Sequence, residues 1–246
     1  MEPFQPFSPL IELACVDSTN NYAMQLVHAG VAQHAQAILA YEQTHGKGQR
    51  GKTWYSPPGE SLSLTLLLQP RPLQPAQAFQ LLVAVALGVH HSLEAATQKP
   101  FAIKWPNDLY WNDRKAGGIL IENVVNSHNW NWALAGVGIN LNQTTFDATL
   151  PHAVSLYQIT QQRFDAKALA LQIRYHILKE LALLQQQGFA NRLQAYNQQL
   201  YKRGERIRLR QQQRVFEATV EGVDAAGYLV TTQGHQFAFG EVEWLI

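Results

Sequence analysis

Eight consecutive residues have the types and spacing of a phosphate-binding loop. Residues 46–53 read GKGQRGKT, which satisfies two such patterns, G-x-x-x-x-G-K-[ST] and G-x-G-x-x-G. In proteins that use either pattern, the loop runs directly into a helix whose N-terminus holds the phosphate. Here Trp54 and then YSPPG follow, and their prolines and glycine prevent a helix from starting. The sequence therefore predicts a glycine loop, residues 46–54, that wraps an anionic ligand with its own amide groups and cations.

Two further segments carry charged and amide side chains close together. They are KWPNDLY at residues 104–110 and DRKAGGILIE at residues 113–122. Together they resemble the central signature of biotin protein ligases. The same family is matched, in the same order, by DSTN at residues 17–20, Gln43 ahead of the glycine loop, GVGIN at residues 136–140 and a β-rich tail. The resemblance covers nearly the whole chain, and KWPND with a downstream lysine is far more specific than a glycine pattern alone.

The resemblance implies both a fold and an activity. The fold is α+β: a mixed β-sheet backed by helices, like the catalytic domain of class II aminoacyl-tRNA synthetases, over residues 1–200, and a small β-barrel of the Src-homology-3 type over residues 201–246. The activity is ATP-dependent ligation of biotin to a lysine of a biotin carboxyl carrier protein, part of acetyl-CoA carboxylase or a related carboxylase. It proceeds through biotinyl-5'-adenylate, with Mg²⁺ arriving together with ATP.

The same resemblance implies the site residues. The catalytic set is Lys47, Arg50, Asp108 and Lys115. The biotin-binding set is Ser18, Thr19, Asn20, Gln43, Gly46, Lys47, Gly48, Gln49, Lys115 and Gly118. The set for ATP and the adenylate is Lys47, Arg50, Trp54, Asn107, Asp108, Lys115 and Asn140. A carboxylate and a triphosphate repel each other, so such a site needs fixed cations and amide donors more than a nucleophile. The neutral urea of biotin, in turn, suits hydroxyl and amide side chains.

Simpler interpretations exist for several of these residues. Residues 17–20 could cap a helix, and Asn107 and Asp108 could shape a turn. Asn140 could end a strand, and Trp105 could fix the KWPND turn. The histidines show no H-x-x-x-H spacing and no Cys/His cluster, so no metal held by the protein is expected.

The chain departs from the family pattern in two places. Gln49 and Thr53 stand where many relatives carry cations, so we expect weaker retention of the adenylate. The chain also starts at the catalytic domain, without a helix-turn-helix extension, so DNA binding is not expected. Two other functions stay open: a lipoate or octanoate ligase or transferase of the same superfamily, and a non-catalytic module that binds biotin or the carrier.

Composition fits an ordinary globular protein with one substantial core. The chain has 246 residues, of which 46% are hydrophobic and 15% charged, and a formal net charge of +1. So small a charge gives no reason to expect nucleic acid or a membrane as partner. The apolar run Leu81 to Val89 is too short to span a bilayer. The first ten residues do not resemble a secretory signal, so we expect a cytoplasmic protein. Cys15 has no cysteine to pair with, and we expect it to be buried in a strand. The protein is expected to be a monomer or a weak homodimer.

Local patterns predict the elements that must position these residues. Helices are expected from residue 19 to about 30 and at 75–96, 166–187 and 192–200. Strands are expected at 11–16, 37–41, 61–66, 101–103, 119–125 and 130–139. Residues 61–66 alternate between polar and apolar side chains, which predicts a half-buried strand. After Gly204, short β runs predict four or five strands.

Overall fold

The main body of the protein is a seven-stranded mixed β-sheet. The computed structural model describes residues 9–55, 57–126 and 129–245. The strands lie in the order β1-β2-β3-β7-β6-β5-β4, with β1 parallel to β2 and the other neighbours antiparallel. Their bounds are Leu10–Leu13 (β1), Ala37–Ala40 (β2), Ser61–Leu68 (β3), Ala102–Lys104 (β4), Asp108–Trp111 (β5), Arg114–Asn126 (β6) and Asn129–Asn140 (β7). The predicted mixed sheet is confirmed.

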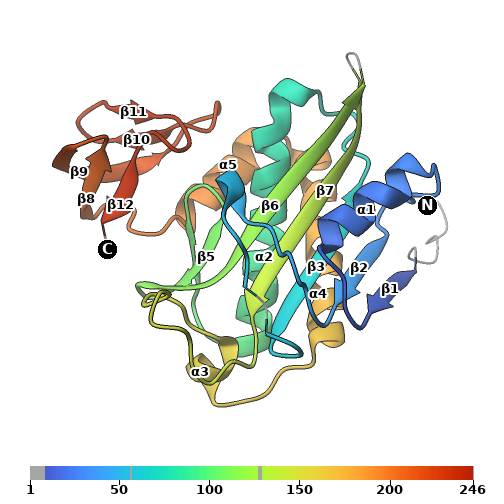
Figure 1. Ribbon diagram of the computed structural model, residues 1–246. Coiled ribbons are helices and arrows are strands. Elements are labelled where there is room, and N and C mark those ends of the chain that lie inside the picture. Colours follow the sequence, from blue (N-terminus) through green and yellow to red (C-terminus); the bar gives the residue numbers. More distant parts are fainter. Residues whose placement is uncertain (1–8, 56, 127–128, 246) are drawn as a thin grey trace.

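Helices cover both faces of this sheet (Figure 1). One face packs against α2 (Ala78–Thr97), which follows the short helix η2 (Pro75–Gln77), and against α4 (Ala166–Gln187). On the other face, α1 (Thr19–His28) packs over the centre of the sheet through Ala23, Leu67 and Leu134. By length and composition, the segment Pro75–Thr97 could cross a membrane, but most of it is buried here as a core helix.

Strand β3 is buried on both faces, so the prediction of a half-buried strand was wrong. All eight residues of β3 are buried. Its leucines at even positions pack into the core with α2 and α4, whereas Ser61, Ser63 and Thr65 face the side of α1. The alternation in the sequence therefore separates an apolar core face from a polar face inside the protein, not from solvent.

Most of the other predicted elements are present, with shifted ends. Helix α4 has the predicted bounds, α5 spans Phe189–Gln198, and a short helix α3 (Leu156–Thr160) was not predicted. Strand β6 begins at Arg114, so Lys115 and Gly118 lie within a strand. Strand β1 ends at Leu13, and Cys15 beyond it is exposed, so the prediction of a buried thiol was wrong. The expectation about a secretory signal rests largely on residues 1–8, which lie outside the described residues.

The C-terminal residues form a second sheet, set to one side of the first (Figure 1). Its five strands are β8 (Arg206–Gln211), β9 (Arg214–Val223), β10 (Leu229–Thr231), β11 (Gln236–Phe237) and β12 (Glu243–Leu245), in the order β11-β10-β9-β8-β12. The predicted number of strands is confirmed, but the strand pairing among the described residues does not close a barrel. The C-terminal sheet region contacts the main body where Trp105 Nε1 donates to Gly227 O (3.0 Å) and where Asn197 Nδ2 of α5 donates to Val223 O (2.9 Å).

Candidate functional site

Three glycines form a strip without side chains of its own on the α1 side of the seven-stranded sheet. Gly118 of β6 pairs with Gly138 of β7, and Leu120 pairs with Gly136, so the three glycines face the same way. A Cβ at Gly136 would lie 2.6 Å from Asn20 Oδ1, and a Cβ at Gly138 would lie 2.5 Å from Trp54 Cε2. A Cβ at Gly118 would lie 3.1 Å from Asp108 Oδ1. We call Gly118, Gly136 and Gly138 the glycine floor, because side chains from three other segments rest directly on it.

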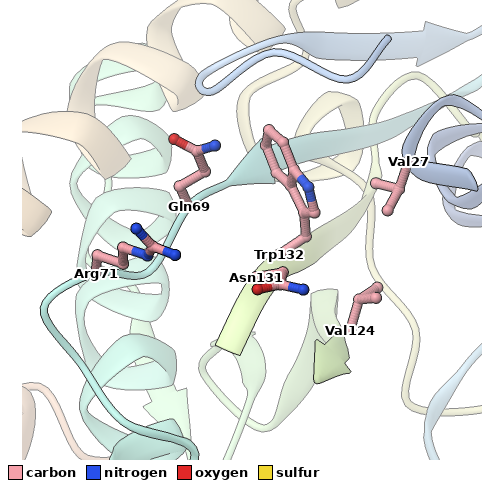
Figure 2. Close-up of a pocket in the computed structure, with 6 residues that line it drawn as sticks. All are labelled: Val27, Gln69, Arg71, Val124, Asn131 and Trp132. Carbon is pink, nitrogen blue, oxygen red and sulfur yellow. The ribbon is translucent and has the colours of Figure 1, made fainter. Parts of the chain in front are cut away.

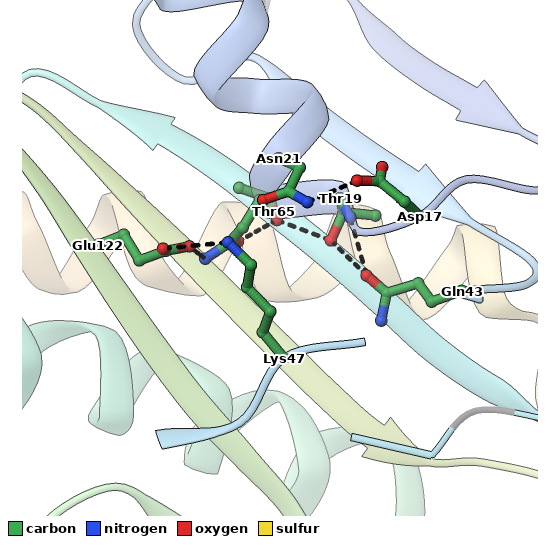
Figure 3. Close-up of polar contacts among 8 residues, drawn as sticks. Asp17, Thr19, Asn21, Gln43, Lys47, Thr65 and Glu122 are labelled. Carbon is green, nitrogen blue, oxygen red and sulfur yellow. Dashed lines mark hydrogen bonds and ion pairs between the residues drawn. The ribbon is translucent and has the colours of Figure 1, made fainter. Parts of the chain in front are cut away.

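A network of amides and hydroxyls stands over the Gly136 end of the floor (Figure 3). Thr19 N donates to Gln43 Oε1 (2.8 Å), and Thr19 Oγ1 lies 3.1 Å from the same oxygen. Thr65 Oγ1 lies 2.8 Å from Thr19 Oγ1 and 2.6 Å from Asn20 Oδ1. The side chain of Ser18, the N-cap residue of α1, makes no capping bond, and Gln43 receives the free N–H of Thr19 instead. The simple capping interpretation therefore does not hold for Ser18.

Glu122 joins this network to the glycine loop. Asn20 Nδ2 donates to Glu122 Oε2 (2.6 Å), and Lys47 Nζ lies 3.5 Å from Glu122 Oε1. The Lys47 and Glu122 side chains are 42% and 32% exposed, so the ion pair itself contributes little stability. The effect of the pair is on position: it places Lys47, a cation of the glycine loop, beside the polar network.

A second charged pair lies at the Gly118 end of the floor. Lys115 Nζ lies 2.7 Å from Asp108 Oδ1, and both side chains are partly exposed. The backbone of Lys115 is fixed on both sides: its N–H donates to His152 O (2.6 Å), and its carbonyl accepts from Val154 N (2.9 Å). The sheet therefore holds an ammonium and a carboxylate together at a solvent-accessible position.

The glycine loop folds back on itself over the floor. Lys47 and Thr53 form an antiparallel bridge, and Trp54 N donates to Gly46 O (2.9 Å). Between them is only the single-turn helix η1 (Gln49–Gly51), as expected for a loop that no α-helix follows. Gln49 Nε2 donates to Ile119 O (3.3 Å). Gln49 Oε1 and Trp54 Nε1 are buried and have no hydrogen-bond partner among the described residues.

Arg50 is not brought to the charged pair. Its backbone is left-handed (φ 57°), and its Nη1 donates to Gly240 O (3.2 Å) in the turn between β11 and β12. The side chains of Asn107 and Asn140 are also used by the protein itself. Asn107 Nδ2 donates to Ile119 O (2.6 Å), and Asn140 Nδ2 lies 3.2 Å from the carbonyl oxygen of Lys115. These two amides brace the backbone of β6, the strand that carries Gly118.

Three residues at the site were not among the predicted ones. Glu122 ends the DRKAGGILIE segment, and Thr65 is a polar residue in a strand taken as half exposed. Lys104 begins the KWPND segment, and its Nζ lies 3.4 Å from Tyr110 Oη and 5.7 Å from the ring of Trp244. Burial lowers the pKa of the Lys104 ammonium. For Glu122, the available signal was that it is the one charged residue in the strand predicted at residues 119–125.

Two cavities lie elsewhere. One, of about 340 Å³, is at the C-terminal end of α1 and is lined by Val27, Gln69, Arg71, Val124, Asn131 and Trp132 (Figure 2). The other, of about 620 Å³, lies among the Pro70–Leu73 segment, α2, α4 and Phe189. Neither includes a predicted site residue. We rank the glycine floor above both, because Trp54 and the Gly46–Trp54 loop lie over it and because the ionic and amide groups converge there.

Comparison with known proteins identifies the family of the chain. Residues 12–140 match the family described as Biotin/lipoate A/B protein ligase. The biotin--[acetyl-CoA-carboxylase] ligase of Paracoccus denitrificans is 32% identical over 224 residues, which is 89% of this chain and 92% of that protein. The bifunctional ligase/repressor BirA of Escherichia coli is 30% identical over 182 residues, 72% of this chain and 55% of that protein. This chain therefore spans about half the length of that relative.

A solved structure has the same fold. The biotin protein ligase of Aquifex aeolicus, in complex with biotin and ATP, superposes with a TM-score of 0.81 at 27% identity, covering 97% of this chain and 99% of that one. The fold is thus that of a ligase catalytic domain with a mixed sheet. The chain belongs to the biotin/lipoate A/B protein ligase family.

Proposed function

We propose that the protein ligates biotin to a specific lysine of a biotin carboxyl carrier protein, with ATP as the source of energy. The observation that carries this proposal is the glycine floor, with a neutral amide–hydroxyl network at one end and the Lys115–Asp108 pair at the other. Gly136 and Gly138 are two residues apart on one strand, a distance of about 7 Å. A ligand with a neutral polar head, a short aliphatic chain and a carboxylate fits that arrangement.

In the first half-reaction, a carboxylate oxygen of biotin attacks the α-phosphorus of ATP, and the bond to pyrophosphate breaks. Two anions must approach each other, so the main task of the site is to stabilise negative charge. Lys115 and Lys47 supply positive charge from opposite ends of the floor. Trp54, resting on Gly138, covers the site and keeps water from the mixed anhydride.

In the second half-reaction, the amine of the carrier lysine attacks the acyl carbon, an amide bond forms and AMP leaves. The amine must lose a proton to become a nucleophile. Asp108 is the carboxylate nearest to the reacting end, and its side chain is 23% exposed, so the incoming lysine can reach it. Asp108 therefore orients that amine and accepts its proton, while Lys115 stays on the leaving phosphate.

The magnesium ion belongs to the same proposal, as a companion of ATP. In the ranges that the structure describes, no three His, Cys, Asp or Glu side chains are grouped so as to hold a metal ion. The two carboxylates of the site, Asp108 and Glu122, are each paired with a lysine, an arrangement that does not suit a metal held by the protein. When bound, the ion would neutralise charge on the β- and γ-phosphates.

The remaining features are also proposals. We infer a cytoplasmic monomer or weak homodimer without nucleic-acid binding, in line with the formal net charge of +1. The relative from Escherichia coli is named both a ligase and a repressor, and only ligation is proposed here. For the C-terminal sheet, we propose closure to a small barrel, because strands β8 to β11 are antiparallel neighbours in sequence order and the last strand, β12, returns to pair with the first, β8.

Exchange of label between pyrophosphate and ATP tests the first half-reaction. We expect exchange that depends on biotin, and transfer of biotin to a carrier protein but not to a carrier whose acceptor lysine is replaced by arginine. Exchange that depends on lipoate or octanoate would make the protein the lipoate-type member of its family. Binding of biotin without exchange would identify a non-catalytic module.

A further inference from the structure

The carboxylate of Glu122 ends the amide–hydroxyl network, and a carboxylate only accepts hydrogen bonds. We propose that Glu122 fixes the direction of the hydroxyl hydrogen bonds in that network, and that this direction selects a head group with an N–H donor beside a carbonyl acceptor. Glu122 and Thr65 would then be positioning residues for substrate specificity. The inference rests on the proposed function. It adds which residues determine whether the site prefers biotin or another acid that this family uses.

The first step is the orientation of Asn20. An asparagine amide can be turned either way, with its oxygen or its nitrogen toward a given neighbour. Here the neighbour is Glu122 Oε2 at 2.6 Å, so the nitrogen must point to it. Asn20 Oδ1 is thereby directed to Thr65, against the sheet at Gly136, where a Cβ would lie 2.6 Å from it.

The second step follows from counting hydroxyl protons. Three oxygen–oxygen contacts, of 2.6, 2.8 and 3.1 Å, join Asn20 to Thr65, Thr65 to Thr19 and Thr19 to Gln43, but the two threonines have only one hydroxyl proton each. Asn20 Oδ1 can only accept, so Thr65 donates to it. Thr19 must then donate its hydroxyl proton to Thr65. No proton is left for the longest contact, the one of 3.1 Å between Thr19 Oγ1 and Gln43 Oε1. Gln43 Oε1 is occupied instead by the backbone N–H of Thr19 at 2.8 Å.

The third step identifies what remains for a ligand. With its oxygen occupied, Gln43 has its Nε2 amide as a donor, and Figure 3 shows this nitrogen pointing away from the network. Among the described residues, none hydrogen-bonds to this nitrogen, and Thr19 Oγ1 keeps an acceptor lone pair. A cyclic urea matches this pair, with its carbonyl on Gln43 and an N–H on Thr19. A dithiolane or an alkyl head has no N–H group, and an anionic head would meet the charge of Glu122.

A neutral side chain at position 122 would remove this constraint. In Glu122→Gln, the new amide can donate to Asn20 Oδ1, so Asn20 can turn and reverse the direction of the bonds at Thr65. The shape of the site is unchanged, since glutamate and glutamine have nearly the same size. Glu122 also pairs with Lys47 at 3.5 Å, and an effect through that cation must be distinguished from an effect through the network.

Thr65 provides the matched control, because it belongs to the network and does not touch Lys47. We would compare wild type, Glu122→Gln, Thr65→Val, Thr65→Ser and the double variant Glu122→Gln/Thr65→Val. Each is assayed for kcat and KM in pyrophosphate exchange, with biotin and with lipoate, and for the KM of ATP. Circular dichroism melting confirms that each variant is folded.

We expect Glu122→Gln and Thr65→Val each to raise the KM for biotin about tenfold or more, with kcat and the KM for ATP nearly unchanged. The preference for biotin over lipoate should fall by a similar factor. Thr65→Ser, which keeps the hydroxyl, should resemble wild type. Because both residues act in one chain of bonds, the double variant should be no worse than the poorer single variant.

Two results would overturn the proposal while leaving the enzyme a biotin ligase. In one, Thr65→Val keeps the wild-type KM and preference while Glu122→Gln loses them, so that Glu122 acts through Lys47. In the other, the effects of the two substitutions multiply, so that they act independently. Failure of wild type itself to exchange with biotin would instead refute the proposed function, and this inference with it.

Discussion

Replacing Gly138 by alanine should displace Trp54 and impair adenylate formation without unfolding the protein. The added Cβ would lie 2.5, 2.8 and 2.9 Å from three atoms of the indole ring. Ordinary contacts to a Cβ begin near 3.4 Å, so the ring must move by about 1 Å. The loop backbone cannot easily shift with the ring, because Trp54 is packed closely against Gly46. A Cβ at Gly46 would lie only 2.3 Å from Trp54 O.

A misplacement of about 1 Å in an active site can lower the rate about a hundredfold. We expect a loss of that order in kcat/KM for biotin-dependent pyrophosphate exchange by Gly138→Ala. The melting temperature should fall by about 4 °C or less, which corresponds to roughly 1 kcal/mol for a chain of this length, because the strained contact is with a loop and not with the core.

Trp54→Ala provides the decisive background for this test. Once the indole is gone, the new Cβ has room, so Gly138→Ala should add no further loss to Trp54→Ala. If alanine at position 138 is as harmful in the Trp54→Ala protein as in wild type, it acts through the strand or the ligand, and the reasoning about the ring is wrong. Wild-type kinetics for the single variant Gly138→Ala would refute it as well.

Three other outcomes are expected. Lys115→Ala should slow adenylate formation about a hundredfold, since one charged contact to a developing anion contributes about 3 kcal/mol. Asp108→Asn should mainly slow the transfer of biotin to the carrier. Single-turnover assays measure each step separately, and impairment of the same step in both variants would contradict this division of roles. Gln49→Arg should slow release of preformed adenylate by about fivefold or less, as measured by filter retention, and an unchanged off-rate would mean that loop packing alone retains it. Burial acts to raise the pKa of Glu180, but hydrogen bonds from His91 and Arg192 lower this pKa overall. The stabilisation that ionised Glu180 gives the fold is therefore complete above about pH 4.5, and it is lost as the pH falls through the lowered pKa. Urea unfolding should show Glu180→Gln to be about 3 kcal/mol less stable at neutral pH and flatter in its acid dependence; equal slopes for the two proteins below about pH 4.5 would contradict this assignment.

The sequence predicted the elements well where one physical signal dominates. The apolar spacing in α4 (Ala166–Gln187) gave its ends correctly, and the prolines after Trp54 correctly excluded a helix. It failed where burial depends on partners far along the chain. Thr65 sits in an alternating pattern that is typical of a strand facing water, and only the packing of α1 over the sheet shows that this polar face is internal.

The site was predicted in part, and the misses have a common cause. The polar residues around Thr19 and the Lys115–Asp108 pair come together as the motifs implied. Arg50 does not, because its direction is set by a left-handed backbone and by the carbonyl of Gly240, 190 residues away. Such a contact leaves no trace in local sequence. Glu122 was missed because its role depends on two partners, one from a helix and one from a loop.

The glycine floor also limits how this protein can evolve. Glycine is the smallest residue, so every substitution at Gly118, Gly136 or Gly138 adds atoms to the floor, and none can deepen it. A lineage that needs to accept a bulkier acid therefore cannot make room there by point mutation. It must alter the segments above the floor, whereas a lineage that discards catalysis can fill the floor in a single step. Substrate range in descendants of this chain should accordingly change through α1 and the glycine loop, with the strands beneath them left as they are.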